Sequence, residues 1–182
     1  MKLDKLIKSC KKKDIKAQGQ LYELYKNKLY ILCLKYCKNK EEAEDNLQDA
    51  FLEIFKNIEK YKNKGSFEGW MKRITIHKAI DKYKKETALN IIINDDILPD
   101  TLIDTDELNI PLDLLLRLVQ ELPSKYRLVF NLYELDNYSH KEISKLLSIS
   151  ESTSRSNLHR AKLILKENIN KINRPKTKRH GN

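Results

Sequence analysis

Glycine and proline, the residues that most often form tight turns and end helices, are scarce in this sequence. Only four of each occur among the 182 residues, whereas an all-β sandwich or barrel needs a turn about every 8–12 residues. Apolar residues recur instead at steps of three and four within residues 21–37 and 43–58. Residues 67–85 and 112–168 also show helical patterns, and Asp14 and Ser124 are placed to cap the helices that follow them. Since this spacing is that of one helix face, we predict an all-α fold.

The charge is distributed unevenly along the chain. The net charge is +10 over residues 1–85, −7 over 86–110 and +7 over 111–182. Two basic blocks favour polyanionic partners for both parts of the chain. The alternative is that all surfaces of this protein are rich in lysine, which would produce the same net charge without such a partner. We predict two small helical domains, at residues 1–85 and 112–170, joined by a flexible acidic linker at residues 86–111. A basic, disordered tail is predicted at residues 171–182.

Several function classes are excluded by what the sequence lacks. It has no run of about 18 apolar residues and no apolar stretch of signal-peptide length at its start, so we expect no membrane insertion and a cytoplasmic protein. The three cysteines, Cys10, Cys33 and Cys37, suit neither a disulfide framework nor a zinc site, which favours core packing. Phosphate-loop, nucleophile-elbow and metalloprotease motifs are absent. We expect a protein without enzymatic activity, metal or cofactor.

A helix-turn-helix pattern occupies residues 139–165. A short helix and a longer one are separated by a turn around Ser148, and Ser139 and Ser150 are positioned to cap them. The outer face of the second helix carries groups that reach base edges and phosphates in a major groove: Ser152, Thr153, Arg155, Ser156, His159 and Arg160. An ordinary helical hairpin is the alternative, but the lack of acids beyond Glu151 on this face favours DNA binding.

An acidic stripe lies on one face of the helix predicted at residues 43–58. Glu41, Asp45, Asp49 and Glu53 follow at steps of four, a spacing at which like charges destabilise a helix. Asp45 and Asp49 have no basic residue three or four positions away. We predict that a basic protein surface binds this stripe. A metal or acid–base site and a plain solvated face are the alternatives.

Aromatic and cationic residues alternate between residues 62 and 85. Such interleaving is typical of surfaces that hold single-stranded or melted nucleic acid, because bases stack on rings while phosphates meet cations. The residues concerned are Lys62, Asn63, Lys64, Phe67, Trp70, Arg73, His77 and Lys82. Phe67 and Trp70 can instead be core anchors, and for Phe67 this interpretation is favoured.

Together these motifs resemble the extracytoplasmic-function (ECF) group of bacterial RNA polymerase sigma factors. EEAEDNLQDAFLEIF is similar to the helix that binds polymerase, and GSFEGWMKRITIHKAIDKYKK resembles the segment that recognises and melts the minus-10 element. LPSKYRLVFNLYELDNYSHKEISKLLSISESTSRSNLHRAK resembles the domain that reads the minus-35 element. The order and spacing of the three segments match the family.

The resemblance implies a role for each segment. The stripe, with Gln48 added to its four acids, would bind the clamp coiled coil of core RNA polymerase. The residues named between 62 and 82 would face the melted minus-10 strand, and the linker would thread toward the polymerase active site. Thr153, Arg155, Ser156, His159 and Arg160 would face the minus-35 major groove. An anti-sigma factor is a further implied partner, since a protein between the two domains would cover both surfaces.

Four positions depart from the family pattern: Asn46, His77, Ser148 and Ser154. Asn46 replaces an apolar residue beside the acidic stripe, and His77 replaces an asparagine. Ser148 stands where the turn usually has glycine, so a left-handed backbone there is strained. Ser154 replaces a buried valine, and its hydroxyl needs a partner such as the carbonyl four residues back.

Two other function classes compete with the sigma-factor interpretation. A stand-alone helix-turn-helix regulator with a helical dimerisation or sensing domain is the main alternative, but it has no need for the acidic stripe or the aromatic-basic helix. A nucleic-acid-processing enzyme is disfavoured because metal and phosphate motifs are absent.

Overall fold

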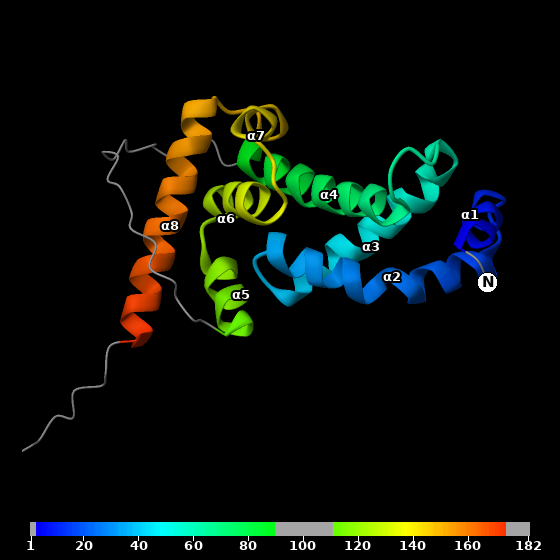
Figure 1. Ribbon diagram of the computed structural model, residues 1–182, viewed down its shortest axis with the longest axis horizontal. Helices are drawn as coiled ribbons and strands as arrows, with labels where there is room; N and C mark the ends of the chain where they lie inside the picture. The colour runs from blue at the N-terminus through cyan, green and yellow to red at the C-terminus, as the bar shows by residue number, and fades with distance from the viewer. Residues whose placement is uncertain (1–2, 90–110, 174–182) are drawn as a thin grey trace, which may run out of the picture. The chain divides into compact units, whose positions relative to one another are not determined.

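A computed structural model describes residues 3–89 and 111–173. Every regular element in these two ranges is a helix, which confirms the all-α prediction. The chain divides into two compact units, Met1–Asn94 and Asp95–Asn182. Figure 1 shows the helices of each unit. Within the described ranges, no helix has both the length and the apolar character needed to cross a membrane.

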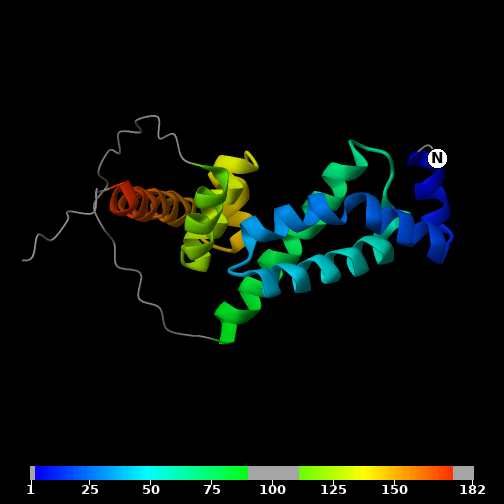
Figure 2. The ribbon, with the colours of Figure 1, turned by 90° about the horizontal axis from the view of Figure 1, so that it is seen from below.

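The first unit contains five helical elements: α1 (Leu3–Lys11), α2 (Ile15–Tyr36), α3 (Lys40–Asn57), the short η1 (Ile58–Lys60) and α4 (Phe67–Leu89). The predicted cap at Asp14 is confirmed, since its Oδ1 accepts hydrogen bonds from the backbone N–H groups of Lys16 and Ala17 at 2.9 and 3.2 Å. Helices α2, α3 and α4 pack against one another, and α2 and α3 run side by side in Figure 2.

The core of the first unit is formed largely by the apolar faces predicted for residues 21–37 and 43–58. On α4 the sequence predicts a side through Trp70, Ile74 and His77, which is wrong, because the buried face runs through Met71, Thr75 and Ile76. Leu21, Leu29, Ile54 and Met71 are fully buried. Asn46 is buried with them, and its Nδ2 donates to the carbonyl of Thr75 and to Cys33 Sγ, both at 3.3 Å. Asn46 is therefore an interior link between α3, α4 and α2. All three cysteines are buried free thiols, as core packing requires.

The second unit contains α5 (Leu112–Glu121), α6 (Ser124–Phe130), the π-helical turn η2 (Asn131–Leu135), α7 (His140–Leu147) and α8 (Glu151–Asn173). Its core brings α5 and α6 against α8 through Leu118, Val119, Leu122, Tyr126, Ala161, Leu165 and Ile169. Helices α7 and α8 also pack against each other.

A buried arginine joins α5 to α6. Arg127 Nη1 donates to the carbonyl oxygens of Gln120 and Leu122 at 2.8 and 2.9 Å, and Nη2 donates to Ser124 Oγ at 3.1 Å. The carbonyl groups that helix α5 leaves unpaired at its end are thus satisfied. The expectation that Ser124 caps α6 is wrong: Pro123 occupies the cap position, and the Ser124 hydroxyl accepts from Arg127 instead.

Two helices extend beyond the predicted domain limits. Helix α4 continues to Leu89 rather than ending near residue 85, and α8 continues to Asn173 rather than residue 170. Most of the predicted acidic linker (90–110) and of the predicted basic tail (174–182) lies outside the described residues.

Candidate functional site

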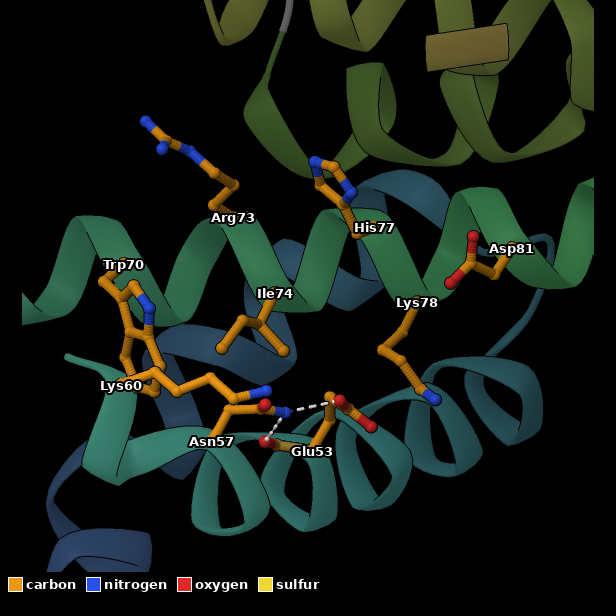
Figure 3. A pocket seen from close by; sticks show the side chains of 9 residues that line it. All are labelled: Glu53, Asn57, Lys60, Trp70, Arg73, Ile74, His77, Lys78 and Asp81. Carbon is orange, nitrogen blue, oxygen red and sulfur yellow. Dashed lines mark hydrogen bonds between the residues drawn. The ribbon is translucent and has the colours of Figure 1, made fainter. Parts of the chain in front are cut away.

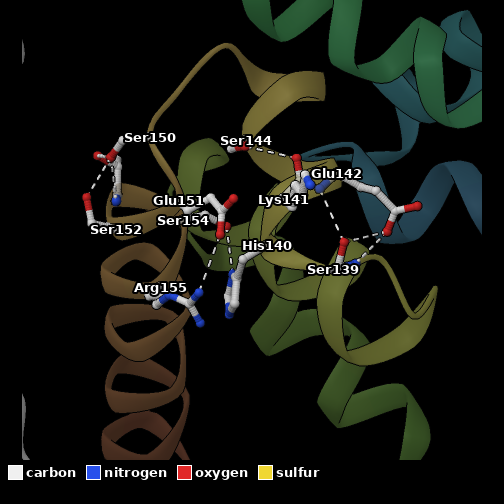
Figure 4. Close-up of polar contacts among 11 residues, drawn as sticks. Ser139, His140, Lys141, Glu142, Ser144, Ser150, Glu151, Ser152, Ser154 and Arg155 are labelled. Carbon is white, nitrogen blue, oxygen red and sulfur yellow. Dashed lines mark hydrogen bonds and ion pairs between the residues drawn. The ribbon is translucent and has the colours of Figure 1, made fainter.

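The helix-turn-helix in the second unit is built on the predicted serine caps (Figure 4). Ser139 and Glu142 form a capping box on α7: the Glu142 N–H donates to Ser139 Oγ, and the Ser139 N–H donates to Glu142 Oε2 at 2.8 Å. These hydrogen bonds hold the pKa of Glu142 below its usual value. Ser150 Oγ accepts from the Thr153 N–H at 2.9 Å and caps α8. Between the helices, Ser148 adopts the expected left-handed backbone, with φ 58°.

A buried polar pair links the two helices of the motif. His140 Nδ1 lies 2.9 Å from Ser154 Oγ, and both side chains are buried. The ring of His140 also stacks on Tyr133, with centroids 4.4 Å apart. The partner of Ser154 is thus this imidazole rather than the carbonyl of its own helix that the sequence predicts. Burial lowers the pKa of His140, and the positive charge of Arg155 lowers it further.

The outer face of α8 displays the side chains predicted to contact DNA. Ser152, Arg155 and Ser156 are exposed, whereas Thr153, His159 and Arg160 are half-buried. Arg155 Nη2 lies 3.4 Å from Glu151 Oε2, one turn earlier on the helix. Arg160 Nη1 donates to the Tyr126 hydroxyl at 3.2 Å, which anchors its guanidinium against α6. The helix therefore carries one exposed cation, Arg155, and one cation that is held against α6, Arg160.

The acidic stripe in the first unit divides into two parts. Glu41, Asp45, Gln48 and Asp49 are exposed on α3, together with Leu52, whose exposure is 69%. We call these five residues the acidic face. Glu53 is half-buried, and its carboxylate accepts a hydrogen bond from Asn57 Nδ2. Within residues 3–89 and 111–173, no group of three or more His, Cys, Asp or Glu side chains is arranged to hold a metal ion.

Helix α4 brings lysines to the acidic face that sequence spacing alone does not reveal. Asp45 and Asp49 line a groove of about 410 Å³ with Lys78, Lys82 and Lys85 on its other side. Lys82 Nζ also lies 3.8 Å from Glu42 Oε1. The positive charges of these lysines thus offset part of the repulsion between the carboxylates of α3. Glu41, Asp45 and Asp49 nevertheless remain exposed.

The loop at residues 62–66 is exposed, and its backbone enters the left-handed region at two positions. Asn63 and Gly65 both have positive φ, at 56° and 84°. Behind the loop, the Tyr61 hydroxyl donates to the Gly65 carbonyl at 2.9 Å, and Lys11 Nζ donates to the Tyr61 carbonyl at 2.8 Å. Lys62, Asn63 and Lys64 are all exposed on it.

The two aromatic residues after the loop have different positions. Phe67 is 4% exposed and packs between Tyr61 and Tyr25, so it is a core anchor and its ring is not available to stack on a base. Trp70 stacks on Phe67, with centroids 5.5 Å apart, but remains half-buried. Farther along α4, Arg73 and His77 are exposed and Lys82 is half-buried.

A pocket between α3 and α4 gathers residues from both predicted surfaces (Figure 3). Glu53, which the sequence assigns to the acidic stripe, faces the same space as Trp70, Arg73 and His77. The rest of its lining is formed by Ile74, Lys78, Asp81, Asn57 and Lys60, of which Asn57 and Lys60 were not singled out by sequence reasoning. The available signal was the spacing of four between Glu53 and Asn57, which places both on one side of α3.

Comparison with known proteins gives the class to which this fold and these surfaces belong. Residues 21–88 match the family described as Sigma-70 region 2, and residues 112–165 match Sigma-70, region 4. A chain with both regions is a sigma factor of the sigma-70 class, and hence a transcription initiation factor rather than an enzyme.

Individual relatives show to which group of sigma-70 factors the chain is similar. The ECF RNA polymerase sigma factor SigW of Bacillus subtilis (strain 168) is 30% identical over 185 residues, which cover 93% of this chain and 97% of SigW. SigM from the same organism is 30% identical over 159 residues, covering 84% of this chain and 94% of SigM. The chain belongs to the ECF group of RNA polymerase sigma factors. This membership favours the sigma-factor interpretation over a stand-alone regulator.

A solved structure shares the fold. The sigma factor RpoE from Bartonella quintana, crystallised with the anti-sigma factor NepR, aligns with 88% of this chain and 100% of its own, with a TM-score of 0.52. The sequence identity is 15%, so the likeness concerns the fold alone.

Proposed function

We propose that the two units divide the work of this alternative sigma factor between three surfaces. The acidic face of α3 binds core RNA polymerase, the 62–66 loop and α4 hold the opened minus-10 strand, and the outer face of α8 reads the minus-35 element. The observation that carries this division is the segregation of charge: exposed carboxylates gather on α3, whereas α8 and the 62–66 loop expose cations.

The acidic face has the composition of a protein-binding surface. Its carboxylates repel a phosphate backbone, and Leu52 offers an apolar side chain in their midst. An exposed apolar residue surrounded by charged ones is a common arrangement at the centre of protein interfaces. A basic helical surface that also offers an apolar contact is therefore the partner this face fits, as the clamp coiled coil of polymerase would provide.

The outer face of α8 suits duplex DNA. Arg155 is exposed near the start of the helix, where residues of a recognition helix reach base edges. Arg155 and Glu151 form an ion pair that is long and exposed, so the guanidinium can leave it for a guanine edge at small cost. Arg160, held by Tyr126, suits a phosphate contact that fixes the register.

The remaining parts of the proposal concern regulation and location. A single anti-sigma factor can inhibit the protein if it offers a basic surface to α3 and an acidic one to α8. We place this activity in the cytoplasm, where core polymerase and promoters are found.

Binding of purified core polymerase tests the docking assignment. Asp45→Lys/Asp49→Lys should abolish co-purification with core and run-off transcription while leaving the helical circular dichroism unchanged. Glu23→Lys/Glu59→Lys makes the same change of charge at exposed acids away from the acidic face and should bind normally. If both double variants lost core binding equally, the loss would result from the change in net charge, and the assignment of the acidic face to core polymerase would be contradicted.

A further inference from the structure

Helix α1 contacts the start of the 62–66 loop through one long-range hydrogen bond. Lys11 Nζ donates to the backbone carbonyl of Tyr61 at 2.8 Å, although the two residues are 50 positions apart in the sequence. The ammonium group also lies 5.9 Å from the centroid of the Tyr61 ring, within the range of a cation–π contact. Tyr61 is the residue that ends η1, directly before the loop. Lys11 therefore holds the point at which the loop begins.

Every polar group of Tyr61 is hydrogen-bonded. Its N–H donates to the Ile58 carbonyl at 3.2 Å, and its carbonyl accepts from Lys11. Its hydroxyl donates to the Gly65 carbonyl at 2.9 Å. The residue is 7% exposed, and its ring lies beside that of Trp70, with centroids 5.5 Å apart. Because Tyr61 reaches from the start of the loop to Gly65, the placement of Tyr61 fixes both ends of this stretch.

The backbone of the loop needs such support. Asn63 and Gly65 both adopt left-handed φ angles, which residues other than glycine rarely take. At the end that joins α4, the Ser66 carbonyl accepts from the Trp70 N–H at 3.1 Å, and the Ser66 hydroxyl accepts from the Gly69 N–H at 3.0 Å. Bonds to α4 thus hold the last residue of the loop, whereas the hydrogen bond at its start comes from a lysine of α1.

Helix α1 is held in place by its own packing. Leu6, Ile7 and Cys10 are buried, and the helix packs against α2 and η1 (Figure 1). The turn that follows is closed by a hydrogen bond from the Asp14 N–H to the Ser9 carbonyl at 3.3 Å. The ammonium group of Lys11 is therefore carried on a support whose position does not depend on the loop.

We propose that Lys11 is a positioning residue for the binding of the opened minus-10 strand. Through Tyr61 and Gly65 it fixes the loop that exposes Lys62 and Lys64. Lys11 itself does not touch the strand, because its ammonium group is directed at Tyr61. This role rests on the proposed contact of the 62–66 loop with the strand, and it makes helix α1 the element that sets the geometry of that contact.

The lifetime of open complexes tests this role. Holoenzyme is assembled from core polymerase and the full chain on a promoter that the parent transcribes, and complexes that resist a polyanion competitor are followed over time. Lys11→Met removes the donor but keeps the apolar stem, and it should shorten the lifetime about three- to tenfold, as expected for the loss of one hydrogen bond. Lys11→Arg keeps N–H donors and should remain within about twofold of the parent.

A second measurement distinguishes positioning from a general loss of structure. Binding of the same holoenzymes to a duplex fragment that ends upstream of the minus-10 element should be equal in parent, Lys11→Met and Lys11→Arg. A variant that was merely unstable would lose both measurements in parallel and would not be rescued by arginine. Lys5→Met removes the same charge from an exposed position on α1 and should keep the lifetime of the parent.

Tyr61→Phe tests the next link, because it removes only the hydroxyl that bonds to Gly65. It should shorten the open-complex lifetime as Lys11→Met does. The double variant should lose little more than either single variant, since both changes act through the same residue. Fully additive losses would show that Lys11 does not act through Tyr61 and would overturn the inference.

The free chain and a loop variant separate this inference from the proposed function. The NMR amide signals of residues 61–65 should shift in Lys11→Met and return toward the parent in Lys11→Arg. Unchanged loop signals, or an unchanged open-complex lifetime, in Lys11→Met overturns the inference. If Lys62→Ala/Lys64→Ala shortens the lifetime and Lys11→Met does not, the strand contact stands and the role of Lys11 is rejected. If neither shortens it, the strand contact of the loop is rejected and the role of Lys11 with it.

Discussion

His140 Nδ1 and Ser154 Oγ lie 2.9 Å apart in the interior of the helix-turn-helix, and they join the first helix of the motif to the recognition helix. The residue that follows Ser154 is Arg155, the exposed cation proposed to read the minus-35 element. The rotation of α8 about its axis, and hence the direction of Arg155, is thus fixed in part by this buried hydrogen bond.

Replacing Ser154 by valine, the residue usual in the family at this position, should destabilise the protein. The valine leaves His140 Nδ1 buried without this partner, which costs about 1–3 kcal/mol. Chemical denaturation followed by circular dichroism measures the loss. Ser156→Ala, two positions away on the exposed face, should change stability by less than about 0.5 kcal/mol. A Ser154→Val protein as stable as the parent would show that the pair contributes nothing.

Acidification should loosen the helix-turn-helix before the rest of the chain. Burial first, and the charge of Arg155 second, lower the pKa of His140 below its ordinary value of 6.5. Because the unfolded state then binds a proton more readily than the folded state, stability is full above pH 6.5 and falls as the pH drops from there through the lowered pKa. The NMR amide signals of α7 and α8 should show the change.

His140→Gln provides the control for that titration. Glutamine retains a group that can bond to Ser154 but does not titrate, so its α7 and α8 signals should vary less with pH. The same pH dependence in parent and variant would assign the effect to another group.

Arg155→Ala should reduce discrimination between minus-35 sequences by about 1–3 kcal/mol per contacted base pair. Arg155→Lys should restore general affinity but little of the discrimination, because an ammonium group lacks the fork of donors that matches a guanine edge. Competition binding with single-base promoter variants measures both effects. A uniform loss over all sequences would make Arg155 a phosphate contact.

Leu52→Ala should weaken binding to core polymerase by about 1–2 kcal/mol with little change in stability, because its side chain is exposed in the free protein and buried in the proposed complex. Ile31→Ala is a suitable control, since Ile31 is 54% exposed on α2. Surface plasmon resonance with immobilised core compares the two. Equal effects would remove Leu52 from the proposed interface.

The cysteines should resist thiol reagents in the folded protein. Cys10, Cys33 and Cys37 are buried, and burial raises the pKa of Cys33 to about 11. Because the thiolate is the reactive form, labelling at neutral pH should proceed no faster than the opening of the first unit. Labelling rates measured with increasing urea test this, and a fast phase without denaturant would contradict it.

Much of the local structure was predictable because its causes lie within a few residues. Asp14, Ser139 and Ser150 bond to N–H groups two or three positions away, and Ser148 bends the chain by its own backbone angles. The helices follow from apolar spacing, and the family follows from the order of the motifs. Ser124 is the exception, since its hydroxyl is taken by Arg127 and the cap position by Pro123.

The relationships that depend on packing were not predictable in the same way. Spacing along one helix shows that Glu53 shares a side with Asp49, but only α4, packed against α3, places it opposite Trp70. Likewise, the partner of Ser154 comes from 14 residues earlier in the chain. The sequence by itself determined the helices, their caps and the family, because periodicity and capping act over one or two turns. Tertiary structure alone decided which side chains share a pocket or a buried bond, because those contacts depend on how separate helices meet.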